Sequence, residues 1–96
     1  MAISKLEYDT ARNCVREFDT ISSEMRGTFS ELKREMDSLE DDLKSRGGDT
    51  LYAKYKDLEP KLAEVPEKVD DFKNFLEGAT EKYEAEDQTL QNQASV

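Results

Sequence analysis

Carboxylates are the side chains that could do chemistry in number, since Asp and Glu supply 23 of the 96 residues and histidine is absent. Acid–base catalysis needs carboxyl groups that converge on one substrate. The densest acidic runs, Glu40-Asp41-Asp42 and Asp70-Asp71, place their members next to each other in the sequence. On a helix such neighbours point in different directions. We therefore interpret these runs as solvated faces and expect a protein that is not an enzyme.

Metal, phosphate and thiol chemistry find little support in the sequence. Without histidine the usual zinc sets are missing, and no spacing matches a calcium-binding EF-hand loop or a phosphate-binding loop. The single cysteine, Cys14, cannot form an internal disulfide. We interpret it as a small apolar residue rather than a reactive thiol, and we expect neither a metal nor a cofactor.

The composition indicates a thin core. Charged residues make up 39% of the chain and hydrophobic residues 35%, and a small domain of this kind often gains stability by associating with a copy or a partner. The formal net charge of −9 repels phosphate backbones and anionic lipids, so we expect neither nucleic acid binding nor membrane anchoring. The first residues lack the basic start and apolar segment of a signal peptide.

Two stretches repeat apolar residues at steps of three and four, the heptad pattern in which positions a and d face a partner helix. One helix is predicted over about 4–44, opened by the capping box Ser4-Lys5-Leu6-Glu7, and a second over about 50–88, followed by a frayed tail at 89–96. The a and d residues of the first helix include Tyr8, Ala11, Val15, Phe18, Met25, Phe29, Leu32, Met36, Leu39 and Leu43, and those of the second include Leu51, Tyr55, Leu58, Leu62, Val65, Val69, Phe72, Leu76, Ala79 and Tyr83.

Residues 45–49 are predicted as the turn between the helices. Paired glycines readily adopt the left-handed conformation that ends a helix, and Asp49 can cap the next one. Arg46, Gly47 and Gly48 form the centre of this turn. The predicted fold is therefore an all-α antiparallel two-helix hairpin in a single domain over residues 1–96.

Charge placement favours one antiparallel register. When residues at the same level have numbers with a constant sum, every a residue faces a d residue, as Phe18 faces Leu76 and Met36 faces Leu58. The flanking e and g positions then pair opposite charges: Asp42 with Lys54, Glu35 with Lys61, Lys33 with Glu59, and Asp19 with Lys73. Exposed pairs of this kind contribute only a few tenths of a kcal/mol, so they set register rather than stability.

Pro60 and Pro66 lie within the second predicted helix. A proline in a helix interior removes a donor and crowds a carbonyl, at about 3 kcal/mol. Both prolines are assigned to positions outside the seam, f and e, and the heptad continues across them. We therefore predict one helix kinked near Pro60 and Pro66, the alternative being that each proline begins a new short helix.

Some apolar residues lie outside the predicted seam, and four of them flank it. Cys14, Ile21 and Phe75 are placed at g positions, and Tyr52 at an e position near the turn. Apolar residues at adjacent flanking sites commonly belong to helix interfaces, and a second hairpin docked there would complete a four-helix bundle. We expect association with a copy or a related helical hairpin.

Three features of the chain occur together: its length and two-helix plan, the midpoint turn Arg46-Gly47-Gly48, and the stretch Tyr83-Glu84-Ala85-Glu86-Asp87. In these features the chain resembles the small Trp-Xaa-Gly (WXG, ESAT-like) substrates of the type VII secretion system of Gram-positive bacteria, whose Tyr-x-x-x-Asp/Glu export motif matches the last stretch. The chain contains no tryptophan, and Ser45 or Arg46 stands where the family has it. It therefore resembles a member whose partner supplies the tryptophan, or a divergent member that uses other turn contacts.

This resemblance implies a dimeric secretion partner or effector that is cytoplasmic before export and is recognised by a membrane ATPase of the FtsK/SpoIIIE type. Tyr83 and Asp87 would carry the secretion signal, and on a helix residues at this spacing share a face. Two alternatives stay open. One is a needle or filament subunit that polymerises through the Ile21 and Phe75 side, and the other is a cytoplasmic chaperone that holds a client there.

Overall fold

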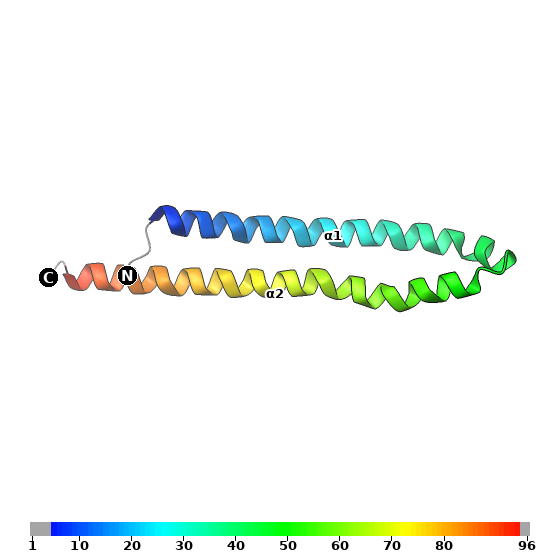
Figure 1. Cartoon of the computed structure of the whole chain (residues 1–96). Helices are drawn as coiled ribbons and strands as arrows, with labels where there is room; N and C mark the ends of the chain where they lie inside the picture. Colours follow the sequence, from blue (N-terminus) through cyan, green and yellow to red (C-terminus); the bar gives the residue numbers. More distant parts are fainter. Residues whose placement is uncertain (1–4, 95–96) are drawn as a thin grey trace. The chain divides into compact units, whose positions relative to one another are not determined.

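Two helices joined by a short turn make up the computed structural model of the protein, which describes residues 5–94 (Figure 1). Helix α1 spans Lys5–Ser45 and helix α2 spans Asp49–Ala94. The predicted all-α hairpin is thereby confirmed. The predicted cap at Ser4 lies outside the described residues, and α2 continues to Ala94 where the sequence predicted a frayed tail from residue 89.

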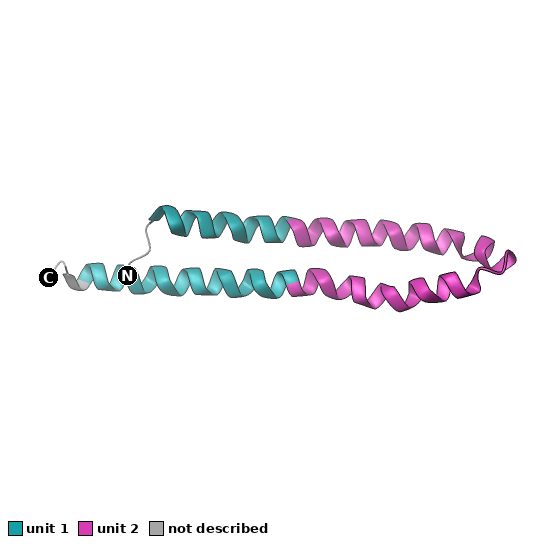
Figure 2. Ribbon diagram, in the orientation of Figure 1, with its two compact units in different colours: residues 1–20, 69–96 teal, residues 21–68 magenta. Residues whose placement is uncertain are grey.

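The chain divides into two compact units, each built from one segment of α1 and one of α2 (Figure 2). Unit 1 consists of Met1–Thr20 and Val69–Val96, and unit 2 consists of Ile21–Lys68. Unit 2 contains the turn. Within each unit the two helical segments run antiparallel to each other.

The turn depends on both glycines. Gly47 has a φ of 76°, a left-handed conformation that side chains rarely adopt. Gly48 donates its backbone N–H to the carbonyl of Leu43, and a Cβ at this position would lie 2.8 Å from that oxygen. The N–H of Arg46 bonds to the carbonyl of Asp42 at 3.2 Å and so closes the last turn of α1.

The inward face of α1 follows the heptad prediction. Tyr8 is buried, and Phe18, Met25 and Phe29 are half-buried. Leu39, near the turn, is the exception, since 46% of it is exposed.

Helix α2 turns a different face inward from the predicted one. Its a residues Tyr55, Leu62, Val69 and Leu76 are buried or half-buried, as the heptad predicted. Four of its d residues are exposed, however, at 59% for Leu51, 46% for Leu58, 40% for Val65 and 51% for Phe72, whereas the d residue Ala79 is half-buried. The e residues take their place, and those that are buried or half-buried are Tyr52, Glu59, Pro66, Lys73, Thr80 and Asp87.

An inward face made of a and e residues is rotated by about 50° from one made of a and d residues, because successive residues are about 100° apart on a helix. The prediction that Pro66 lies outside the seam is therefore wrong, since this residue is fully buried. Its ring is apolar and has no N–H to satisfy, so it can pack in the interior at the cost of a weakened helix. Helix α2 runs through both prolines without a break, and Figure 2 shows it curved within unit 2.

The core is thin, as the composition indicated. Among the described residues, the buried hydrophobic side chains are those of Tyr8, at 6% exposure, and Tyr55, at 9%. Neither helix contains a segment apolar enough to cross a membrane, as far as residues 5–94 show. A chain with so little buried apolar surface gains much from covering what remains exposed.

Candidate functional site

The predicted secretion-signal residues lie on α2 in unit 1, and they have different surroundings. The side chain of Tyr83 is 51% exposed, although the heptad placed it in the seam opposite Ala11. Asp87, one turn later, is half-buried and accepts a hydrogen bond from the hydroxyl of Tyr8 on α1. The ring of Tyr83 is thus open to a partner, whereas the carboxylate of Asp87 is engaged within the chain.

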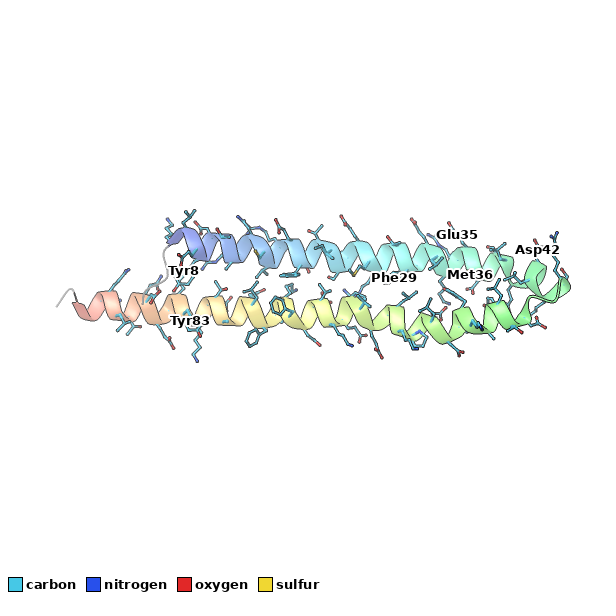
Figure 3. All side chains as sticks on the ribbon, in the orientation of Figure 1. Tyr8, Phe29, Glu35, Met36, Asp42 and Tyr83 are labelled. Atoms are coloured by element: carbon cyan, nitrogen blue, oxygen red, sulfur yellow. The ribbon has the colours of Figure 1, made fainter. Side chains whose placement is uncertain are left out.

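Tyr8, Arg12, Glu84 and Asp87 form a polar group that we call the Tyr8 cluster. Beside the Tyr8–Asp87 bond, Arg12 makes an ion pair with Glu84 and lies 3.6 Å from Asp9. Figure 3 shows Tyr8 on the side of α1 that faces α2. Burial, followed by the hydrogen bond and charge of Asp87, raises the pKa of Tyr8 to about 12. At neutral pH its hydroxyl therefore remains a proton donor.

The heptad pattern does not predict the Tyr8 cluster, because it treats Tyr8 only as an apolar a residue. It also places Asp87 at an e position that flanks the seam and does not lie within it. The pairing of Arg12 with Glu84 becomes recognisable only once the a and e residues of α2 are known to face inward.

Tyr52 is half-buried within unit 2 and contacts α1, and its assignment to a dimer interface stays a prediction. Its hydroxyl donates to Asp37 at 3.0 Å, and its ring centroid lies 6.2 Å from that of Tyr55. Burial and the contact with Asp37 raise the pKa of Tyr52 to about 12, and the same hydrogen bond lowers the pKa of the Asp37 carboxyl. The rotation of α2 explains this placement, because it turns the e position toward α1.

The other predicted interface residues are accessible to different extents. In unit 1, Phe75 is 72% exposed and Cys14 is half-buried. In unit 2, Ile21 is 42% exposed. An exposed phenylalanine is consistent with a docking role, and its partner remains a prediction.

An apolar feature that the sequence did not predict is a row of exposed residues on α2 in unit 2. Leu51, Leu58 and Val65 follow one another at seven-residue spacing and are 40–59% exposed. We call these three residues the apolar strip. At this spacing they lie close to one line along the helix surface, which suits a partner helix.

Three exposed lysines, Lys54, Lys61 and Lys68, border the strip at the neighbouring g positions. The sequence predicted that Lys54 pairs with Asp42 and Lys61 with Glu35. Within residues 5–94 neither pair forms. The rotation of α2 carries its g residues away from α1, which leaves positive charge beside the strip.

The remaining predicted charge pairs have mixed outcomes. Lys73 lies 3.4 Å from Asp19, so this pair is confirmed in unit 1. The predicted pair of Lys33 with Glu59 is replaced by pairs within each helix: Lys33 lies 3.6 Å from Asp37, and Glu59 lies 3.5 Å from Lys56. Charge pairing therefore identified the antiparallel arrangement but not the face of α2.

The described surface has open grooves. A groove of about 450 Å³ in unit 2 is lined in part by Phe29, Tyr55, Leu62 and Pro66, and such a lining suits apolar side chains. No group of three or more acidic, cysteine or histidine side chains in the part of the chain that the structure describes could hold a metal ion.

The chain matches no family model, no curated protein and no solved structure.

Proposed function

We propose that this chain is a non-enzymatic binding protein that docks a helix of another chain along α2. The observation that carries the proposal is the apolar strip, whose three residues are 40–59% exposed. Burying an aliphatic side chain contributes roughly 1.5–3 kcal/mol, so covering the exposed half of three of them contributes roughly 3 kcal/mol. This is a large gain for a hairpin with a thin core.

We further propose that the chain is a WXG-like substrate of type VII secretion, working as a homodimer or as half of a heterodimer. The two-helix plan, the diglycine turn and the exposed Tyr83 support this. The ring of Tyr83 anchors in a groove of the secretion ATPase. Asp87 reaches a donor on that ATPase after exchanging its bond with Tyr8.

Export of a double variant tests this role. Replacing Tyr83 and Asp87 with alanine removes both proposed contacts, so secretion from a host with a type VII system should be abolished while the helical circular dichroism remains. The matched control is Glu86→Ala, an exposed acidic residue in the same turn, which should be exported normally. Unchanged export of the double variant would overturn the proposed signal.

A structural subunit of a needle or filament is the second candidate, favoured by Phe75, which is 72% exposed. Such a subunit grows in mass as its concentration rises, whereas a secreted dimer reaches a fixed mass. Light scattering over a concentration series separates the two.

A further inference from the structure

We propose that the occupant of the apolar strip is a second copy of this chain, docked so that the turns of the two hairpins lie at the same end. This inference rests on the proposed binding function and names its partner. It concerns unit 2 alone, and it is carried by the placement of charges around the strip.

One side of unit 2 carries both signs of charge. In an antiparallel helix pair the d and g positions of the two helices border the same side. On α1 this side holds Leu39, which is 46% exposed, with the exposed acidic g residues Glu35 and Asp42 beside it. Figure 3 shows Glu35 and Asp42 outside the seam, while Met36 points toward α2.

On α2 the same side holds the apolar strip and its lysines. Asp42 and Glu35 are seven residues apart, as are Lys54 and Lys61. Among the described residues none of these four side chains has an ion-pair partner. The face therefore has an apolar centre, an acidic edge on α1 and a basic edge on α2, with equal charge spacing on the two edges.

Such a face is complementary to itself. A two-fold interface uses the same patch on both copies, so each patch must contain the features that it binds. A two-fold axis along the hairpin lays α1 of one copy over α2 of the other. The acidic edge of each copy then meets the basic edge of the other, and the apolar strip of each copy lies against α1 of the other, beside Leu39.

The alternative axis, across the hairpin, lays α1 over α1 and α2 over α2. Acidic edges then face acidic edges and lysines face lysines, which opposes association. A foreign partner would have to carry its own acidic row at seven-residue spacing, and a second copy already has one. The charges thus select both the partner and its orientation.

Charge reversal tests the pairing with the full-length chain in sedimentation equilibrium. The wild type should form a dimer. Glu35→Lys alone and Lys61→Glu alone should each weaken it by about tenfold, because each creates two like-charge contacts across the two-fold axis. Carrying both changes in one chain should restore the wild-type affinity. Asp41→Lys makes the same charge change at an exposed f position, on the side of α1 away from the seam, and should leave the dimer intact.

The orientation is tested by a cross-link. In a Cys14→Ser background, Arg46→Cys places the single thiol at the turn. Oxidation should then join two chains if the turns lie together. A dimer that does not cross-link at residue 46 would contradict the proposed orientation. A chain that stays monomeric, or a double charge variant whose dimer affinity is not restored, would contradict the proposal that the partner is a second copy.

Failure here is distinguishable from failure of the proposed function. The variant Leu58→Asp places a charge in the apolar strip. If the chain is monomeric and this variant is not exported, another protein occupies the strip and the binding function stands. If the dimer forms as described and the Tyr83/Asp87 double variant is exported, the secretion role fails and the self-docking face stands.

Discussion

Tyr8 joins the two helices of unit 1 through one hydroxyl. It is 6% exposed and donates to Asp87, so both the ring and the hydroxyl contribute to the fold. Buried polar groups are costly when their partners are removed. The hydroxyl therefore matters for stability, and it also occupies a carboxylate that the proposed export signal uses.

Tyr8→Phe should lower the melting temperature by a few degrees, because the hydrogen bond from the Tyr8 hydroxyl to Asp87 is lost while the ring keeps its packing. Thermal unfolding followed by circular dichroism measures this. Tyr83→Phe is the matched control, since the structure gives its exposed hydroxyl no hydrogen-bond partner among the described residues. Equal melting temperatures for wild type and Tyr8→Phe would contradict the proposed contribution of the Tyr8–Asp87 hydrogen bond to stability.

The tyrosines also make stability depend on alkaline pH. Burial and acidic neighbours raise the pKa of Tyr8 and of Tyr52 from 10.0 to about 12. Because the folded pKa lies above the unfolded one, the protonated form favours folding; the contribution is complete below pH 10 and is lost as pH rises toward 12. Unfolding in urea across this range should show the loss, with a smaller loss in Tyr8→Phe. A Tyr8 that titrates near 10 would argue against its burial.

At the scale of the elements, replacing a glycine with alanine should have opposite effects on stability in helix α1 and in the turn. A Cβ at Gly27, inside α1, would meet open space, whereas a Cβ at Gly48 would meet Leu43. Gly27→Ala should stabilise the protein by about 0.5–1 kcal/mol, since alanine reduces the backbone entropy lost on folding. Gly48→Ala should destabilise it. Urea unfolding measures both, and a stabilising Gly48→Ala would contradict the turn geometry.

The rotation of α2 predicts unequal roles for two leucines that the heptad treats alike. Leu62 is half-buried, while Leu58 is 46% exposed. At concentrations where the chain is monomeric, Leu62→Ala should cost about 1–2 kcal/mol and Leu58→Ala less than about 0.5 kcal/mol. If urea unfolding shows that the two variants lose similar amounts of unfolding free energy, α2 packs against α1 through its a and d residues, as the heptad predicted.

The helices, the turn and the inward face of α1 were predictable because each depends on local chemistry. Glycines end α1, and seven-residue repeats of large apolar residues mark its buried face. The face of α2 was not predictable from the same rule, because heptad counting gives weight only to strongly apolar residues. Tyr52, Pro66 and the stem of Lys73 also bury surface, and the polar ends of Tyr52 and Lys73 reach acidic partners on α1.

Heptad counting was limited in the same way in predicting the candidate sites. Phe75 and Ile21 were correctly expected to be exposed, since both lie well outside the repeat. Tyr52 was placed outside the seam, whereas it is half-buried and bonded to Asp37 of α1, and the apolar strip was assigned to the core. Both differences come from one rotation of α2, which depends on packing between segments far apart in the sequence.

At the scale of the whole molecule, the chain combines a weak core with an apolar surface bordered by charge. A strongly acidic protein, with a net charge of −9, repels its own copies at long range. The lysines beside the strip offset that repulsion at one place. Salt screens the long-range repulsion between copies, so raising its concentration should favour burial of the apolar strip. It also screens the contacts between acidic and basic edges, so the two copies should be held less firmly in one orientation.

The most direct test of the self-docking face is an isotope-filtered nuclear Overhauser experiment on a mixture of labelled and unlabelled chains, which detects only contacts between copies. We expect contacts from the methyl groups of Leu58 to Leu39 of the other copy. Contacts of the Leu58 methyls with groups of their own chain alone would contradict the proposed pairing.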